Sequence, residues 1–447
     1  MNVVIVGAGP AGIAAAGVLA SHGVRPVLVD EADTPGGQVW CRFRDERAVD
    51  TLMRGEASHY RRIHASFDTL RDRIDYRPGT LAWAVSDRTL HVAANGRADA
   101  QPFERLLLAT GAADRTLPIP GWTTPGVFTL GGAQALLKGQ GYAIGRLVVF
   151  LGASPLLYVA ALQYALAGVT VAAVLDTTPF HRKLHALPRL ASDATTLRRG
   201  VLTMAALRSR GVPIRHGVCL RRVLGDGRVT GISFEADGRE QVIACDAVAM
   251  GFGLKPETQL AELAGAAFRF DTASRQFLPA ADGRCSDSVY AAGDGCAIGG
   301  ADAAEASGAL AAYAVLADSG AAVPERERAA LRRRVARLRR FQRGLADAFR
   351  WPAHWIAAMP DDTVLCRCDC VTVGEMRRAV RLELGPREVN RGKAITRVGM
   401  GRCEGRFCGL AVAELIAAEC RVPLEDVGRL RAQAPVKPLS LAMVGEA

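Results

Sequence analysis

The amino-acid sequence predicts an α/β fold class, in which strand-turn-helix units of the nucleotide-binding type precede a small helical domain. Three observations lead to this prediction. A glycine-rich turn, Gly7 to Gly12, follows the first apolar run; a second strand-turn-helix pattern extends from Leu147 to Leu175; and two cysteine pairs, Cys366-Arg-Cys368 and Cys403-x4-Cys408, lie near the end of the chain. Because 447 residues are too many for one ordinary core, we expect two or three domains.

The composition argues against several classes of protein. The net charge of +11 comes partly from arginines crowded between Arg326 and Arg350, with few aromatic residues among them. We therefore expect a solvated helix or a surface for an acidic partner there, and no nucleic acid. Eleven cysteines in a chain of this length do not indicate a disulfide-stabilised secreted protein. Because Met1 to Val6 lacks a basic leader and continues directly into the glycine-rich turn, we expect a cytoplasmic protein.

The first unit is predicted to bind a dinucleotide. Val3 to Val6 is a short apolar run typical of a buried parallel strand, and the glycines that follow it are spaced G-x-G-x-x-G. Gly7 permits the tight turn, Gly9 lets the backbone approach a pyrophosphate, and Gly12 lets the next helix pack closely on the strand. Asp30 ends the second strand, 18 residues after Gly12, where its carboxylate is placed to hold ribose hydroxyls.

Two more strand ends support this interpretation. One is Ala109-Thr110-Gly111; the other is Gly293-Asp294, which precedes a helix that glycines open at Gly299 and Gly300. With these three motifs in order, the chain resembles the glutathione-reductase-like flavoproteins, which have two dinucleotide-binding domains. The resemblance implies FAD, flanked by Thr110, Gly111, Gly293, Asp294 and Gly300.

A fourth segment, Pro35-Gly36-Gly37-Gln38, matches the part of that family that passes beside the flavin, so Gly37 and Gln38 are also predicted to bind the cofactor. Disulfide reductases of this class need two neighbouring redox cysteines. Here Cys41 is alone and the central region has no C-x-x-C, so we interpret Cys41 as a bystander thiol and exclude a disulfide reductase.

The second unit repeats the design with two of the three glycines lost. Gly152 is present, but Ser154 and Leu157 stand at the second and third positions. A side chain at Ser154 crowds the approach to a pyrophosphate, and Leu157 pushes the helix from the strand. Asp176, at the end of the next strand, would suit a ribose diol. We predict a Rossmann-like domain kept as a scaffold, or for another nucleotide, and expect no NAD(P) there. Gly152, Pro155 and Gly168 break the apolar stretch, so we also expect no transmembrane segment.

The rest of the chain is predicted to contain a linker helix and a cysteine domain. Apolar residues recur every three or four positions from Leu331 to Phe349, which indicates an amphipathic helix that packs between domains or docks onto a partner subunit. The predicted boundaries are residues 1–112 and 249–320 for the FAD domain, 113–248 for the second domain, 321–360 for the linker, 361–432 for the cysteine domain and 433–447 for a tail.

The cysteine pairs predict an iron-sulfur cluster, because such clusters need four thiolates. Thr372-Val-Gly-Glu375 has capping-box spacing and predicts a short helix, and a second helix should follow Cys408. The segment with Cys366 and Cys368, together with Thr396 to Cys408, resembles the bacterioferritin-associated-ferredoxin-like domain. That resemblance implies a [2Fe-2S] cluster on Cys366, Cys368, Cys403 and Cys408. Structural zinc and no metal are the alternatives, and we interpret Cys370 as a non-ligand.

Taken together, nearly the whole chain resembles the alpha subunits of multi-subunit amino-acid dehydrogenases, which act on D-hydroxyproline, opines such as octopine and nopaline, or proline, and the B subunit of hydrogen cyanide synthase. The resemblance implies a flavin-containing beta subunit that oxidises the amine, a small ferredoxin-like gamma subunit, and a complex that is cytoplasmic or peripheral to the inner membrane. No residue can be named as a substrate base. A self-sufficient NAD(P)H-dependent reductase and a non-enzymatic cluster-bearing sensor are the other interpretations.

Overall fold

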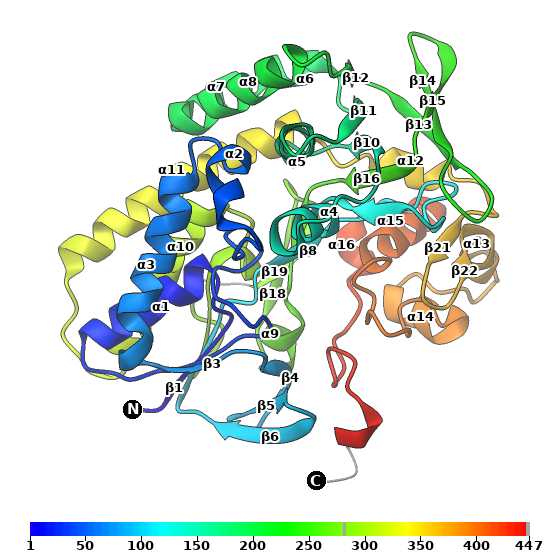
Figure 1. The fold of residues 1–447 in the computed structure, drawn as a ribbon. Helices are drawn as coiled ribbons and strands as arrows, with labels where there is room; N and C mark the ends of the chain where they lie inside the picture. Colours follow the sequence, from blue (N-terminus) through cyan, green and yellow to red (C-terminus); the bar gives the residue numbers. More distant parts are fainter. Residues whose placement is uncertain (280–282, 444–447) are drawn as a thin grey trace.

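Two five-stranded parallel sheets covered by helices form the body of the protein, and a small helical domain lies beside them (Figure 1). The computed structural model describes residues 1–279 and 283–443. The predicted tail therefore extends, at residues 444–447, outside the described residues. The α/β fold class is confirmed.

The first sheet holds the glycine-rich turn at its carboxyl edge. Its strands have the order β20-β7-β1-β2-β3, all parallel. They are β1 (Val3–Val6), β2 (Val27–Val29), β3 (Asp75–Arg77), β7 (Arg105–Leu108) and β20 (Val289–Ala291). Against them lie α1 (Pro10–Ser21), α3 (Ala57–Leu70) and α10 (Ala301–Asp318). A three-stranded antiparallel sheet completes this domain, with β4 (Leu81–Ser86), β5 (Thr89–Ala94) and β6 (Arg97–Pro102).

The second sheet repeats this plan with the order β12-β11-β10-β16-β9. Its strands are β9 (Val127–Thr129), β10 (Leu147–Gly152), β11 (Thr170–Asp176), β12 (Ile214–His216) and β16 (Ala247–Gly251). The helices beside it are α4 (Leu130–Ala135), α5 (Leu156–Leu166) and α8 (Ala194–Arg208), and a three-stranded antiparallel sheet adds β13 (Cys219–Leu224), β14 (Gly231–Ala236) and β15 (Arg239–Ala244). The apolar stretch from Leu147 is thus strand, helix and strand, as expected. Within the described residues, no helix has the length and apolar character needed to cross a membrane.

The predicted domain boundaries need correction. The boundary at 248/249 falls inside β16, which pairs with β10 and β9 and so belongs entirely to the second sheet. The chain returns to the first domain in β17 (Leu254–Pro256), which pairs antiparallel with β8 (Ala112–Asp114). The chain therefore passes between the first and second domains along this two-stranded ribbon. It could not be located from the sequence, because pairing between segments 140 residues apart leaves no local pattern.

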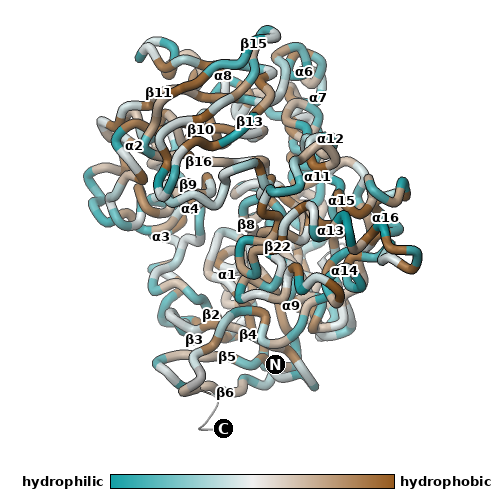
Figure 2. The backbone as a smooth tube through the Cα atoms, turned by 90° about the vertical axis from the view of Figure 1, so that its right-hand side faces the viewer, coloured by the Kyte–Doolittle hydropathy of each residue, from teal (hydrophilic) through white to brown (hydrophobic). Residues whose placement is uncertain are grey.

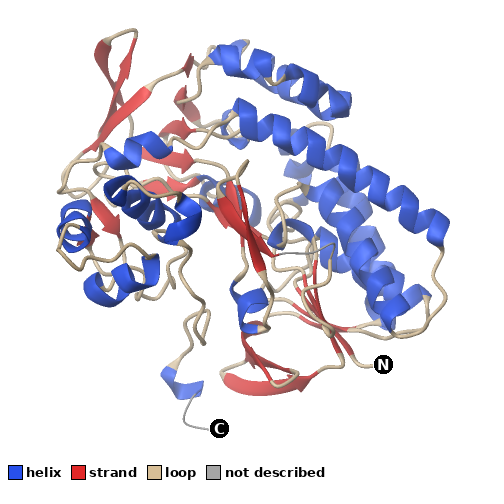
Figure 3. Ribbon diagram, turned by 180° about the vertical axis from the view of Figure 1, so that it is seen from behind, coloured by secondary structure: helices blue, strands red, loops and turns tan. Residues whose placement is uncertain are grey.

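A long helix joins the two sheet domains and leads to the cysteine domain (Figure 3). It is α11 (Glu325–Ala348), and its apolar face packs on α10 of the first domain and on α6 (Phe180–His185) and α7 (Leu187–Leu190) of the second. Packing between domains was the first of the two expectations for this helix, and it is confirmed.

The cysteine domain shares a hydrophobic core with the second sheet. Side chains from β10 and β16, such as Leu151 and Val248, belong to the same buried cluster as Leu415 and Ile416. Hydrophobic residues follow the strands of this sheet, whereas the outer loops are mostly hydrophilic (Figure 2). The domain consists of α12 (Ala353–Ala357), β21 (Val364–Cys366), β22 (Val371–Thr372), α13 (Val373–Val380), α14 (Val389–Thr396), α15 (Gly409–Cys420) and α16 (Leu424–Val427). The predicted capping box at Thr372 and the helix after Cys408 are both present.

Candidate functional site

The first glycine-rich turn has the geometry of a phosphate cradle. Gly7 has a φ of +104°, and a Cβ there would collide with the carbonyl of Ala109. A Cβ on Gly12 would collide with the carbonyl of Gly7, so the helix packs directly on the turn. In contrast, the nearest atom to a Cβ on Gly9 would be the Cα of Gly37, at 3.7 Å. The roles predicted for Gly7 and Gly12 are therefore confirmed, and the open side of Gly9 leaves room for a pyrophosphate at the helix start.

A cavity of about 1110 Å³ runs along this turn. Except for Gly12, which lies behind the turn, every residue predicted to bind the cofactor lines it. These residues are Gly7, Gly9, Asp30, Gly37, Gln38, Thr110, Gly111, Gly293, Asp294 and Gly300. The cavity thus fits an extended dinucleotide such as FAD, whose cradle is described above.

Asp30 is tied to the protein backbone. One of its carboxylate oxygens accepts a hydrogen bond from the amide of Ala8, and the other accepts one from the amide of Ala32 at 2.7 Å. Burial raises the pKa of Asp30. Its neighbour Glu31 is exposed and also lines the cavity. Sequence reasoning missed Glu31, although the adjacent acidic pair was visible; ribose binding by Asp30 stays a prediction.

The end of the chain forms one wall of the cavity. The amide of Val436 donates to the carbonyl of Trp83 in β4 at 2.9 Å, and the guanidinium of Arg406 donates to the carbonyl of Val436 at 2.6 Å. Lys437 forms an ion pair with Glu31. These contacts hold residues 436–437 over the cofactor cradle. No sequence pattern in the tail indicated this role.

Another part of the cavity wall is built from the two later motifs. Thr110 donates its hydroxyl to the carbonyl of Glu257 at 2.6 Å, and the amide of Glu257 donates to the carbonyl of Gly111 at 2.9 Å. Asp294 accepts the amides of Gly299 and Gly300 at 2.7 and 3.1 Å, and burial raises its pKa. The carboxylate thereby fixes the glycine turn that opens α10.

The second turn, at Gly152 to Leu157, lacks the open backbone that the first turn has at Gly9. The hydroxyl of Ser154 accepts the amide of Leu156, the first residue of α5, at 3.2 Å. That amide is one of the helix-start donors that a phosphate would otherwise bind. Leu157 is fully buried and belongs to the core. The hydroxyl of Ser154 therefore occupies one of the helix-start donors, and the second turn has buried side chains at two positions where the first turn has glycine.

Asp176, which would have suited a ribose, is fully buried in an ionic network. Its carboxylate forms an ion pair with Lys183 at 2.7 Å and accepts the hydroxyl of Tyr158, and His216 lies 3.8 Å away. Burial alone would raise the pKa of Asp176, but the neighbouring His216, Lys183 and Tyr158 outweigh it and lower this pKa. The ring of Phe349, just after α11, lies 4.9 Å from the Lys183 ammonium. The Asp176 carboxylate, which by its place after the strand would suit a ribose diol, therefore faces the protein interior.

The four predicted cluster cysteines meet as two pairs. The side chain of Cys366 lies against that of Cys408, and the side chain of Cys368 lies against that of Cys403. The Cys408 contact, together with backbone amides, lowers the pKa of Cys366 to about 6 although burial opposes the shift. Cys370 is exposed, which agrees with its interpretation as a non-ligand.

The pairing of these thiols matches the donor set of a [2Fe-2S] cluster. Structural zinc, the alternative, would require four sulfurs at about 2.3 Å from one centre. A [2Fe-2S] cluster instead takes one pair of thiolates per iron. The donor set therefore fits the cluster that the resemblance implied.

The cysteine loop also reaches the cofactor cavity. Arg406 and Phe407, between Cys403 and Cys408, line the cavity beside Gly111 and Gly293. Arg406 forms an ion pair with Glu257 at 2.7 Å, and both side chains are largely buried. Burial opposes ionisation of Glu257, but the charges of Arg406 and Lys255 outweigh it and lower its pKa. This buried pair fixes the loop against the Thr110-Gly111 turn.

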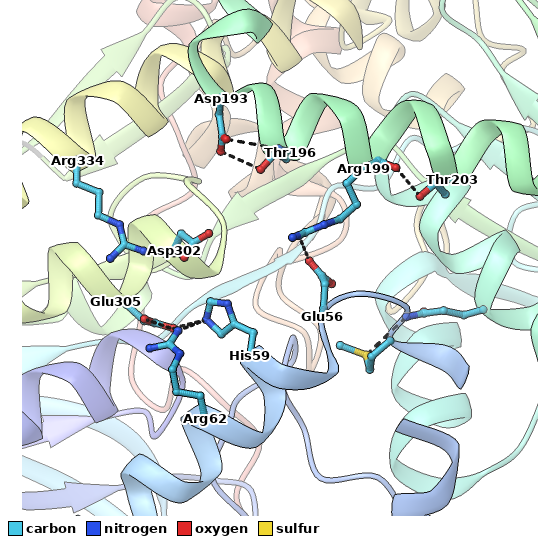
Figure 4. Close-up of polar contacts among 12 residues, drawn as sticks. Glu56, His59, Arg62, Asp193, Thr196, Arg199, Thr203, Asp302, Glu305 and Arg334 are labelled. Carbon is cyan, nitrogen blue, oxygen red and sulfur yellow. Dashed lines mark hydrogen bonds and ion pairs between the residues drawn. The ribbon is translucent and has the colours of Figure 1, made fainter. Parts of the chain in front are cut away.

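Beyond the cradle, the cavity continues between the two sheet domains and is crossed by ion pairs (Figure 4). Arg199 reaches from α8 to Glu56 before α3. His59 and Glu305 are 2.8 Å apart, and Arg62 contacts both of them. His59, Asp302 and Glu305 come close enough to suggest a metal site, but Arg62 and Arg334 neutralise the two carboxylates. We interpret this group as a salt-bridge network.

Comparisons with known proteins agree with this geometry. The family model of the pyridine nucleotide-disulphide oxidoreductases matches residues 1–311. The A subunit of opine oxidase from Rhizobium meliloti is 35% identical over 100% of this chain and 87% of its own length. The HcnB subunit of hydrogen cyanide synthase from Pseudomonas aeruginosa is 33% identical over 98% of this chain and 96% of its own length.

Solved structures share the fold. L-Proline dehydrogenase from P. horikoshii superposes with a TM-score of 0.71 at 19% identity and covers 99% of this chain and 79% of its own. The thioredoxin reductase of T. acidophilum superposes with a TM-score of 0.51 at 20% identity over 72% of this chain and 99% of its own. The family match ends before the cysteine domain, whose cluster stays a prediction. The chain belongs to the pyridine nucleotide-disulphide oxidoreductase family of flavin-dependent oxidoreductases, in the group that contains the opine oxidase and hydrogen cyanide synthase subunits named above.

Proposed function

We propose that this chain is the electron-transfer subunit of a heteromeric amino-acid or imino-acid dehydrogenase. A flavin-containing partner subunit would oxidise a secondary amine such as D-hydroxyproline or an opine, and this chain would pass the electrons through FAD and a [2Fe-2S] cluster. The observation that carries the proposal is the position of the cysteine loop, because Arg406 and Phe407 form part of the wall of the FAD cavity. Two redox centres that share a wall can exchange electrons directly.

The residues of this chain have separate tasks in the proposal. Gly9 and the start of α1 bind the pyrophosphate, and Glu31 and the tail close the ribose end. The Glu257–Arg406 pair holds the cysteine loop against the turn at Gly111. A flavin accepts two electrons and releases them singly, whereas a [2Fe-2S] cluster carries one, so the two groups convert hydride chemistry into stepwise transfer.

The second domain supports an electron source other than NAD(P)H. Ser154 and Leu157 remove the phosphate cradle, and Asp176 is held inside by Lys183. The relatives named above are subunits by name, which agrees with a partner chain that carries the amine-oxidising site. We further propose that the electrons pass to a small ferredoxin-like subunit and that the complex works in the cytoplasm or at the inner membrane.

The cluster assignment can be tested on the purified chain. Cys408→Ser should lose the iron and the visible absorption of the cluster while FAD content stays unchanged, because Cys408 is buried among the other cysteines. Cys370→Ser, at an exposed position in the same segment, is the matched control and should keep both. Iron bound at full content in Cys408→Ser, or zinc in place of iron in the anaerobically purified wild type, would contradict the assignment.

Coupling between the two centres can be tested by photoreduction of the flavin under anaerobic conditions. Low-temperature EPR would then follow how fast the cluster is reduced. Arg406→Met should slow this step at full iron and FAD content, because the loop loses its anchor on Glu257. Arg402→Met changes an exposed arginine of the same loop and should leave the rate unchanged. Equal rates in wild type and Arg406→Met would remove the structural support for direct transfer.

A further inference from the structure

Lys138 is a buried lysine that the proposed function does not use. It lies in a five-residue π-helical segment (Leu136–Gln140) that follows α4, and π-helical turns inside helices are frequent at functional sites. Its side chain is only 4% exposed, yet it lines the cofactor cavity. The ammonium donates to the carbonyls of Gln38 and Val39 at 3.4 and 3.2 Å.

No carboxylate neutralises this ammonium in the part of the chain that the structure describes. Lys183, another buried lysine that lines the cavity, is paired with Asp176 at 2.7 Å. Burial lowers the pKa of Lys138, and the nearest acidic groups, Cys41 and Glu56, act in the opposite direction. Glu56 is already paired with Arg199. Because a buried cation without an anion is costly, the counter-charge is expected from a molecule bound in the cavity.

The position of Lys138 relative to the cradle indicates which part of the cofactor it meets. The pyrophosphate and ribose of the ADP half belong at Gly9 and Glu31. Gly37 lies next to this cradle, because a Cβ placed on Gly37 would be 3.0 Å from the Cα of Gly9. The next residue is Gln38, whose carbonyl accepts a hydrogen bond from Lys138. The other half of the dinucleotide, the flavin, must therefore extend along the side of the cavity that Gln38 and Lys138 line.

We propose that the Lys138 ammonium is the electrostatic partner of the reduced, anionic flavin. Reduction of the flavin adds two electrons and one proton, which leaves one negative charge spread over N1 and the C2 carbonyl. A fixed cation in a cavity of low polarity stabilises that charge and so raises the tendency of the flavin to take electrons from the partner subunit. This inference rests on FAD binding in the cavity, which is part of the proposed function.

The test compares Lys138→Met and Lys138→Gln, which remove the charge, with Lys138→Arg, which keeps it. Arg343→Met removes one charge from an exposed position of α11 and is the matched control. The readouts are FAD content, the midpoint potential of the flavin, and the affinity for sulfite, which adds to the flavin N5 and also places a negative charge on N1. Loss of the cation should lower the equilibrium constant for reduction about tenfold, or about 30 mV for a two-electron couple. Sulfite affinity should fall by a similar factor, on the order of tenfold.

Each outcome decides the proposal. A lower midpoint potential and weaker sulfite binding in Lys138→Met and Lys138→Gln, with wild-type values in Lys138→Arg and Arg343→Met, would support it. A sulfite affinity within twofold of wild type, together with a midpoint potential within about 10 mV of wild type, in both neutral variants would overturn it. If both neutral variants lose FAD, the lysine serves retention of the oxidised cofactor and the proposal is also overturned. A wild-type chain purified without FAD would instead contradict the proposed function itself, so the two failures can be told apart.

Discussion

The two strand-turn-helix units of this protein have the same architecture but differ in the turn that would meet a phosphate. In both, a buried parallel strand leads through a tight turn at a glycine, Gly7 or Gly152, into a helix. At the next positions they diverge, because Gly9 leaves the backbone open while Ser154 binds the helix-start amide with its own hydroxyl. The fold therefore depends on the apolar strands and the first glycine, whereas the ligand site depends on the second and third glycines.

The acidic residues at the end of the second strand of each unit also differ in whether they line the cavity. Asp30 accepts a hydrogen bond from the amide of Ala8 and so joins the end of the second strand to the glycine-rich turn, while Glu31 lines the cavity. Asp176 is buried, where it pairs with Lys183, accepts the hydroxyl of Tyr158 and lies near His216. These interactions hold the second carboxylate away from the cavity, so we expect that glycines alone will not create a nucleotide site in the second unit.

The largest effect is expected from a side chain in the working cradle. Gly9→Val keeps an extended backbone conformation that valine adopts readily, and nothing but Gly37 lies within 4 Å of the new Cβ. It would exclude the pyrophosphate and cost one or two charge-assisted hydrogen bonds of about 1.5–3 kcal/mol each. We expect FAD affinity to fall at least about tenfold, measured by flavin fluorescence. Wild-type FAD content in this variant would contradict the assignment of the cradle.

The buried network of the second unit should control stability and leave the cofactor unaffected. Lys183→Met leaves the Asp176 carboxylate buried without its cation. Loss of one partner of a buried pair costs about 3–5 kcal/mol, measured by urea unfolding, while FAD content should not change. Lys437→Met is the control, because it removes the lysine of an ion pair whose carboxylate, Glu31, is exposed. Its effect on the free energy of unfolding should stay below about 1 kcal/mol.

The same network gives a pH dependence of known sign. The pKa of Asp176 is lowered in the folded chain, so its charge stabilises the fold at every pH above its unfolded-state pKa of about 4. That contribution is lost as the pH falls through the lower folded-state pKa. The difference in unfolding free energy between wild type and Asp176→Asn should therefore be equal at pH 7 and pH 5 and shrink only below about pH 4. A difference that already shrinks between pH 7 and pH 5 would show that Asp176 is not held ionised.

A smaller effect is expected at the tail. Lys437→Met breaks the ion pair that holds the chain end against Glu31. Because an exposed ion pair contributes about 0.2–1 kcal/mol, FAD dissociation should become about two- to fivefold faster. Stopped-flow release of FAD would measure this. An unchanged rate would mean that backbone contacts of Val436 alone retain the tail.

No gain of NADH binding is expected from placing glycines at the second and third positions of the second turn, although Leu157→Gly should also lower stability because Leu157 is fully buried. Ser154→Gly with Leu157→Gly opens the turn, but Asp176 stays paired with Lys183 beneath Phe349. Calorimetric titration with NADH should detect no binding at millimolar concentration, on the order of the weakest affinity that the method resolves. NADH binding by this variant would show that the two missing glycines alone account for the difference in nucleotide binding that we expect between the units.

The sequence predicted those features that depend on local geometry. Gly7 and Gly12 were interpreted correctly because a turn and a close helix contact require residues without a Cβ, and the Thr372 capping box because its residues are three apart. Glu31, Lys437 and Lys138 were missed as parts of the cavity. Each meets a segment that is distant in the chain, such as Lys437 with Glu31 or Lys138 with Gln38. The misplaced boundary at 248/249 has the same cause, because strand order depends on long-range pairing.

The most direct test of the central claim is an anaerobic titration of the FAD-loaded, cluster-intact chain, followed by visible absorption and low-temperature EPR. We expect no rapid flavin bleaching with NADH, NADPH or D-hydroxyproline alone. When the amino-acid substrate is added together with the flavin-containing partner subunit, the flavin and then the cluster should be reduced. Rapid bleaching by either nicotinamide nucleotide without a partner would contradict the account and identify the chain as a self-sufficient reductase.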